Sequence, residues 1–173
     1  MITAVLAGQP PEDVMTTTSV RTPHADVLRD RDVMSERITV QPRKQGVGLR
    51  REDACRVGAM RRIAAARLRH CGLEALSDEV TLVVSELVTN ALLHSGTAEV
   101  GVTMAIQDGF LTITVTDGMS GAAVPGLADG DAESGRGLDI VEYVVKEHGG
   151  AWGTCEAGAE TWCRFALPEE ASR

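Results

Sequence analysis

The chain has 173 residues and a formal net charge of −8, a length typical of one domain with a core of its own. An acidic chain repels nucleic acid, so direct binding of DNA or RNA is disfavoured. No apolar run reaches the ~18 residues of a membrane span, and the four cysteines form no C-x-x-C pair, which disfavours a zinc site. We therefore expect a cytoplasmic protein with reduced thiols that does not bind membranes.

The N-terminal segment differs from the rest of the chain. Residues 1–36 carry prolines and a polar Thr/Ser run without apolar periodicity, which predicts a disordered tail ahead of a single domain at 37–173. Between Arg37 and Arg69 there are ten Arg or Lys residues against Glu52 and Asp53, so this stretch is locally +8 (10 − 2) and the remainder −16. A basic patch on an acidic protein more often contacts an acidic protein, or its own acidic half, than DNA.

The segment 51–72 is predicted to form a helix that ends at Gly72, because apolar residues recur on one face and arginines take the other. Gly58 lies inside it and costs about 1 kcal/mol relative to alanine. The arginine face suits either a partner-docking surface or a solvated face. The apolar face is expected to comprise Ala54, Val57, Ile63, Ala64 and Leu68.

A second helix is predicted to begin at Ser77 as its N-cap, with acidic residues in the first turn, where the helix dipole favours them. Glu86 and Asn90 lie about 40° apart at the edge of its apolar stripe, so we expect them at the rim of the core. His94 is interpreted as a C-terminal imidazole favoured by the dipole, slightly ahead of a supporting role in a site. The stripe, spaced i, i+3, i+4, i+7, is Val80, Val83, Val84, Leu87, Val88, Ala91 and Leu92.

Alternating patterns predict two hairpins. The first turns at Asp108–Gly109, and the second turns at "AGAE" between "AWGTCE" and "TWCRFAL". Cys155 and Cys163 can face each other in the second hairpin, although we expect buried thiols. A glycine-rich loop over 117–135 separates the hairpins. It leads into a helix whose stripe is Leu138, Val141, Val144 and Val145 and which ends at Gly149 or Gly150.

The order of these elements is helix, helix, hairpin, glycine loop, helix, hairpin. This order predicts an α+β fold, namely a two-layer α/β sandwich. We expect a mixed, largely antiparallel sheet that helices cover on one face.

Four signals of chemical interest follow one another along the chain. Each alone has an ordinary explanation, such as a polar margin of an amphipathic helix, a turn aspartate or a helix boundary. They are Glu86-x-x-x-Asn90, Asp117, Gly135-Arg136-Gly137-Leu138 and Gly158-x-x-Thr161.

Together these signals suit a nucleoside triphosphate. Glycines around Gly135 let backbone N–H groups approach phosphate closely, and the following helix N-terminus favours anions. Arg136 can add charge-assisted bonds to phosphate oxygens, and Asn90 offers a neutral oxygen ligand for Mg²⁺ that bridges phosphates. Glu86 can accept a proton from a hydroxyl or water near the terminal phosphate, and Asp117 can accept a hydrogen bond from a purine amino group. Neither a P-loop nor a G-x-G-x-x-G fingerprint follows a strand.

The motifs resemble those of the GHKL ATPases, which share the Bergerat ATP-binding fold. "SELVTNALLHSG" resembles their N box, "VTDGMSG" the G1 box, "ESGRGLDIV" the G2 box and "GAETWCRF" the last glycine–threonine motif. The resemblance covers about Arg51 to Leu167. Within that superfamily, the short layout and the wording "ESGRGL" resemble the branch of anti-sigma-factor serine kinases.

The resemblance implies a role for each matched residue. Glu86 would be the general base that takes the proton from a partner's serine, Asn90 would coordinate Mg²⁺, and Asp117 would read the adenine amino group. Three glycines would shape the phosphate loops: Gly121, Gly135 and Gly137.

Further implications concern the adenine and the lid. Thr161 would sit near the adenine, and Met119–Ser134 would form the ATP lid. The sequence departs from the family pattern at Met119, where a glycine is usual, and at Ala159 or Glu160, where a basic residue is often seen. We therefore expect a modest affinity for ATP.

The function implied is that of an ATP-binding regulatory serine/threonine kinase. It would phosphorylate a serine on an antagonist protein, bind a sigma factor and form a homodimer. The alternative is a nucleotide-dependent binding module without phosphotransfer, in which ATP sets the lid conformation; the altered G1 box favours it, whereas the intact Glu86 favours the kinase. A sensor histidine kinase ranks lower, because His70 in "RLRHCG" lies by a helix end without an acidic neighbour.

Overall fold

A computed structural model describes residues 31–40, 48–94, 98–117, 136–155 and 159–168. Its five strands are β1 (Arg31–Thr39), β2 (Glu99–Gln107), β3 (Phe110–Thr116), β4 (Ala151–Thr154) and β5 (Glu160–Ala166). They form one sheet in the order β1-β2-β3-β5-β4, and every neighbouring pair is antiparallel. The helices are α1 (Arg51–His70), α2 (Ser77–His94) and α3 (Arg136–Glu147), with a 3-10 turn η1 (Glu74–Leu76) before α2.

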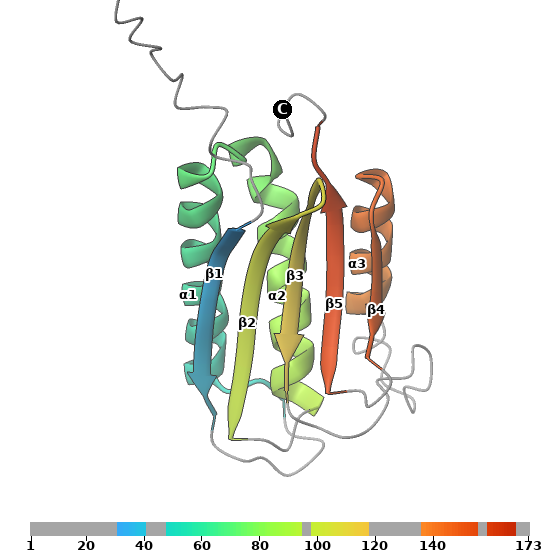
Figure 1. Cartoon of the computed structure of the whole chain (residues 1–173). Helices are drawn as coiled ribbons and strands as arrows, with labels where there is room; N and C mark the ends of the chain where they lie inside the picture. The colour runs from blue at the N-terminus through green and yellow to red at the C-terminus, as the bar shows by residue number, and fades with distance from the viewer. Residues whose placement is uncertain (1–30, 41–47, 95–97, 118–135, 156–158, 169–173) are drawn as a thin grey trace, which may run out of the picture.

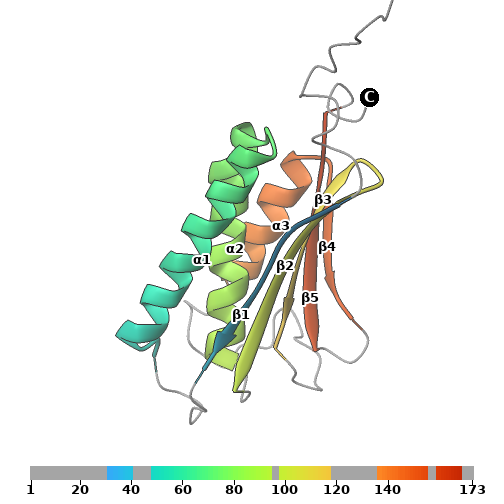
Figure 2. The ribbon, with the colours of Figure 1, turned by 60° about the vertical axis from the view of Figure 1, so that its left-hand side comes forward.

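The three helices cover one face of the sheet (Figure 1, Figure 2). The predicted two-layer sandwich is therefore confirmed, with a sheet that is antiparallel throughout its described strands rather than mixed. None of the helices in the described ranges is long and apolar enough to cross a membrane.

Strand β1 corrects the predicted end of the N-terminal tail. Residues 31–36 were assigned to that tail, but they pair with β2, from Arg31 opposite Ile106 onward. A bulge beside Asp32 shifts the register, so Val33 and Met34 are both buried. A bulged strand lacks the strict alternation that signals a strand in a sequence. Residues 1–30 lie outside the described part of the chain, and their disorder stays a prediction.

Helix α1 ends as predicted, because Gly72 has the positive φ, 73°, that glycine adopts readily after a helix. Its buried side differs from the prediction: Ala54 is exposed, while Met60 and Asp53 are buried. The Asp53 carboxylate is tolerated there because Arg56, one turn later, donates to it at 2.8 Å. The outer side carries exposed arginines, namely Arg51, Arg61, Arg62, Arg67 and Arg69.

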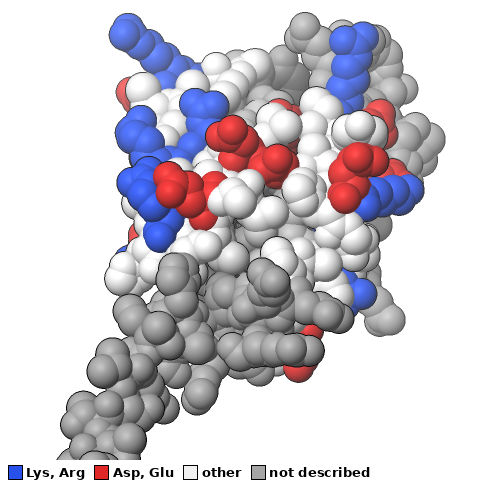
Figure 3. All heavy atoms as spheres, turned by 90° about the horizontal axis from the view of Figure 1, so that it is seen from above, with Lys and Arg blue, Asp and Glu red and all other residues white. Residues whose placement is uncertain are grey.

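The charges are unevenly distributed at the end of the molecule where α1 ends and α2 begins. Seen from above, Lys and Arg side chains gather on the side where α1 lies, and Asp and Glu side chains lie next to them (Figure 3). One contact between the two groups is the 3.8 Å ion pair of Arg69 with Glu74, both well exposed. Exposed pairs of this kind add little stability, so this pair leaves Arg69 available to a partner.

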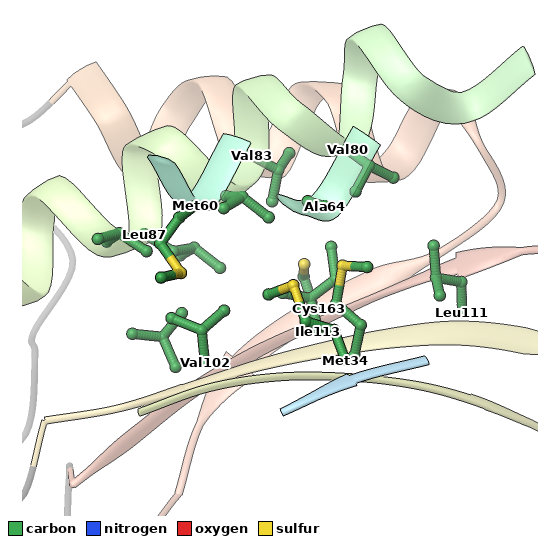
Figure 4. Close-up of a cluster of buried hydrophobic side chains, with 14 of the residues drawn as sticks. Met34, Met60, Ala64, Val80, Val83, Leu87, Val102, Leu111, Ile113 and Cys163 are labelled. Carbon is green, nitrogen blue, oxygen red and sulfur yellow. The ribbon is translucent and has the colours of Figure 1, made fainter. Parts of the chain in front are cut away.

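Helix α2 supplies the centre of the core. Figure 4 shows Val80, Val83 and Leu87 on the helix side, with Val102 and Ile113 of the sheet opposite them. Burying one such side chain contributes roughly 1.5–3 kcal/mol, so this stripe holds α2 firmly in place. All seven residues predicted for the stripe are buried: Val80, Val83, Val84, Leu87, Val88, Ala91 and Leu92.

The start of α2 differs from the prediction. Ser77 was expected to be an N-cap, which needs an extended backbone, but it has φ −62° and ψ −41° and is already helical. The cause is η1, which runs directly into α2 and receives the Ser77 N–H on the carbonyl of Glu74.

The strands of both predicted hairpins pair, although residues 157–158 of the second predicted turn lie outside the described residues and Glu160 belongs to β5. Asp108 and Gly109 have φ values of 52° and 78°, which a tight I′ turn requires. In the second hairpin, Cys163 lies opposite Trp152 rather than opposite Cys155. All four thiols are free. Cys163 is buried as expected, but Cys155 is only half-buried, so the expectation of a buried thiol is wrong for Cys155; Cys55 is exposed.

The cysteines should differ sharply in reactivity. Burial raises the pKa of the Cys163 thiol from 9.0 to about 12, and the thiolate is the reactive form. At neutral pH we expect a disulfide reagent to modify exposed Cys55 in the folded protein and Cys163 only in urea. The raised pKa also means that the stability from the neutral thiol is complete below pH 9.0 and is lost as the pH rises toward about 12. Mass spectrometry of labelled peptides checks the expected difference in labelling between Cys55 and Cys163. Fast labelling of Cys163 in the folded protein would contradict this expectation.

Candidate functional site

Four of the elements place their predicted motifs at one end of the molecule. In Figure 1, α2 and β3 end at the lower side, and α3 and β5 begin there. Asn90 lies one turn before the end of α2, and Asp117 directly follows β3. Gly137 lies in the first turn of α3, and Thr161 near the start of β5. Residues from all four predicted motifs therefore share one end of the sandwich.

The polar row of α2 lies at the margin of the core. Glu86 and Asn90 are half-buried, as expected for residues at the edge of the buried stripe. The neighbouring Ser85 hydroxyl donates to the carbonyl of Thr81 at 2.7 Å, so this hydroxyl is used within the helix. His94 is exposed at the end of α2. Glu86 and Asn90 are thus polar groups of α2 that lie between the core and solvent.

The carboxylate of Glu86 lies against the first turn of α3. A Cβ atom built on Gly137 would stand 2.7 Å from Glu86 Oε2. The first N–H groups of a helix have no partner within the helix, and the helix dipole favours negative charge there. The structure therefore places a proton acceptor beside a helix end that stabilises anions.

Asp117 and Thr161 lie on the helix-covered face of the sheet. Thr161 is the register partner of Val115, which is buried on that face, and Asp117 follows Val115 by two residues and so points the same way. The Asp117 N–H donates to the carbonyl of Ala159 at 3.0 Å, so the end of β3 is joined to the glycine–threonine motif. Asp117 and Thr161 are half-buried. An ionised aspartate at this position is an acceptor suited to an amino group.

The start of α3 combines an exposed charge with an anchor. Arg136 is exposed at the first position of the helix, whereas Leu138 is partly buried and packs against the hydrophobic core. Leu138 thereby fixes the helix end that carries Gly137. Gly121, Gly135 and the proposed lid, Met119–Ser134, lie outside the described residues.

The protein side chains fit a magnesium ion only if a ligand brings further oxygens. Within the described ranges there is no group of three or more His, Cys, Asp or Glu residues that could hold a metal ion. Mg²⁺ in nucleotide sites usually takes one or two protein oxygens and completes its shell with phosphates and waters. The half-buried amide of Asn90 suits an ion that arrives with a nucleotide.

Two contacts of this site were not predicted from the sequence. They join Glu86 to Gly137 and Asp117 to Ala159, and each links segments far apart in the chain. Periodicity reports which side of an element is buried, but it does not report which elements are neighbours. The order of the motifs along the chain was the only sequence feature that indicated their proximity in the fold.

Comparison with known proteins identifies a family that matches this chain. A model of the family described as "Histidine kinase-, DNA gyrase B-, and HSP90-like ATPase" matches residues 75–171. Among solved structures, the histidine kinase domain of a blue-light activated histidine kinase, EL346 of Erythrobacter litoralis, is similar, with 25% sequence identity and a TM-score of 0.43. The similarity covers 67% of this chain and 62% of that chain, which is less than two thirds of its length. No curated protein matches. The residues matched by the family model include every described residue of the candidate site.

Proposed function

This chain belongs to the family of histidine kinase-, DNA gyrase B- and HSP90-like ATPases, and on that premise we propose that it is an ATP-dependent protein serine kinase. The observation that carries the proposal is the position of Glu86. Its half-buried carboxylate lies at the N-terminus of α3 and one turn before Asn90. A module that only bound ATP would need no proton acceptor at that position.

Each matched residue has a task in the binding of ATP. Asp117 would accept a hydrogen bond from the adenine amino group, and Thr161, on the neighbouring strand, would lie beside the adenine. Arg136 donates charge-assisted hydrogen bonds to phosphate oxygens. Asn90 would supply an amide oxygen to Mg²⁺, which would neutralise charge on the phosphates. Backbone N–H groups at Gly121 and Gly135 would complete the phosphate site.

Glu86 acts as the general base of the transfer. It accepts the proton of the partner's serine hydroxyl while the serine oxygen forms a bond to the γ-phosphorus. The bond from that phosphorus to the bridging oxygen breaks, and its electron pair stays with ADP. The products are phosphoserine and ADP, and the Glu86 carboxyl returns its proton to solvent.

We propose that the acceptor is an antagonist protein with a target serine and that the kinase binds a sigma factor when the antagonist is phosphorylated. The motif "ESGRGL" at 133–138 supports the assignment to the branch of anti-sigma-factor serine kinases. The exposed arginines of α1 support an acidic partner, because an acidic surface is attracted to them and repelled by the rest of this acidic chain.

Binding of ATP is expected to stabilise the protein. ATP with Mg²⁺ at about 100 times its dissociation constant should raise the free energy of unfolding by roughly 2.7 kcal/mol, as measured by calorimetry.

Asp117→Asn turns one acceptor oxygen into a donor. We expect this change to weaken ATP binding by about 10- to 150-fold, from the loss of ~1.5–3 kcal/mol of a charge-assisted hydrogen bond. A wild-type protein that ATP does not stabilise would contradict the proposal.

The transfer itself is tested with ATP labelled at the γ-phosphate. Candidate antagonist proteins are incubated with the kinase, and a serine-to-alanine variant of each antagonist is the matched control. Label on the wild-type antagonist alone supports the kinase. ATP-dependent binding of the partner without any label would favour the nucleotide-dependent binding module instead.

A further inference from the structure

The backbone conformation of Gly137 does not explain why this position holds a glycine. Among the described glycines, positive φ angles occur at Gly72, Gly109 and Gly149. Gly137 has no such φ and lies in the first turn of α3. Glycine is a poorer helix former than alanine, so alanine would suit α3 better if nothing else acted on this position.

The surroundings of Gly137 supply the reason. A Cβ atom there would meet Glu86 Oε2 at 2.7 Å, and its next neighbours would be Glu86 Cδ at 3.8 Å and Glu86 Cβ at 3.9 Å. All three atoms belong to one side chain, so Gly137 faces Glu86 along its length. Real Cβ atoms essentially never approach another heavy atom within 3.0 Å. Because Oε2 is the free end of a flexible side chain, a methyl group at this position would turn the carboxylate away and leave α3 in place.

We propose that Gly137 is a positioning residue for Glu86: the missing Cβ lets the carboxylate lie against the first turn of α3. This inference rests on the proposed function, in which Glu86 is the general base. It differs from the role in a phosphate loop that the family resemblance implies for Gly137, because the contact is with a side chain of α2 and involves no phosphate.

The test compares Gly137→Ala with Gly58→Ala. Gly58 also lies inside a helix and is buried, but a Cβ there would meet its nearest atom, Arg62 Nη1, at an ordinary 3.6 Å. We expect Gly137→Ala to lower the rate constant of transfer up to about 100-fold, the effect of a reacting group displaced by roughly 1 Å. The dissociation constant of ATP and the melting temperature should stay near their wild-type values. Gly58→Ala should leave the transfer rate unchanged.

A double variant separates positioning from a general disturbance of the site. Aspartate at position 86 is one methylene shorter and does not reach the added methyl group. Glu86→Asp alone is slow because its carboxylate is withdrawn, and adding Gly137→Ala to it should slow the transfer no further. If the two substitutions instead multiply their effects, Gly137 does not act through Glu86 and the inference is wrong.

A crystal structure of Gly137→Ala gives a readout that does not depend on activity. We expect the carboxylate of Glu86 to be turned away while the backbone of α3 stays in place. A carboxylate in its original position, or a loss of ATP affinity with an unchanged transfer rate, overturns the inference. If the wild-type protein transfers no phosphate, the proposed function fails, and the crystal structure still decides whether Gly137 positions Glu86.

Discussion

Gly150→Ala is expected to destabilise the protein by about 4 kcal/mol or more, a loss that few single substitutions reach. A Cβ at this position would lie 1.8 Å from the carbonyl oxygen of Arg164 and 2.9 Å from its carbonyl carbon. These are backbone atoms of β5, and Arg164 is held in register with Thr112 on one side and Ala151 on the other. Neither atom can move without breaking the sheet. Urea unfolding followed by circular dichroism measures the loss.

The neighbouring glycine provides a matched control. Gly149 has a φ of 63°, and a Cβ there would meet Ala166 Cβ at an acceptable 3.6 Å. Gly149→Ala should therefore cost only the left-handed backbone strain, about 1–2 kcal/mol. Equal urea midpoints for the two variants would show that β5 yields to the added methyl group, contrary to expectation.

Glu86→Gln is expected to lower the rate of phosphotransfer by about 10²- to 10⁴-fold, the usual contribution of a general base. Glutamine keeps the size of the side chain, but its amide does not take up the serine proton. ATP binding should stay close to that of the wild type, because the adenine and phosphate contacts are assigned to other residues. Single-turnover rates and titration calorimetry measure the two quantities separately.

The control for this substitution is Glu142→Gln. Glu142 lies on α3, and its carboxylate is paired with Lys146 on the surface. The chemical change is identical, but the residue is not part of the proposed site, so the transfer rate should not change. If Glu86→Gln transferred phosphate at the wild-type rate, the proposed kinase mechanism with Glu86 as general base would be wrong, whatever the affinity for ATP.

The sequence predicted the elements whose burial is periodic. The stripe of α2 was predicted residue for residue, since a regular helix packed on a sheet buries every third and fourth side chain. The turn at Asp108–Gly109 was predicted because it needs a positive φ angle at two successive residues, and few residue pairs adopt this readily. These signals are local, so they can be read from neighbouring residues alone.

The remaining features depend on tertiary contacts. The bulge beside Asp32 hid β1, and the pairing with Arg56 helps to explain why Asp53 is buried. For the site, the sequence predicted Glu86 at the rim of the core, but not the element that it contacts. That contact depends on how α2 and α3 lie side by side, which no local pattern encodes.

The strand order has a consequence for biosynthesis. Although β5 is the last strand of the chain, it pairs between β3 and β4, and its start brings Ala159 and Thr161 next to Asp117. The end of the site that we propose for the adenine is thus assembled by a pairing of distant segments, which forms slowly. A nascent chain whose β5 is still inside the ribosome lacks this half of the site. We therefore expect nucleotide capture to be among the last events of folding, after translation has passed β5.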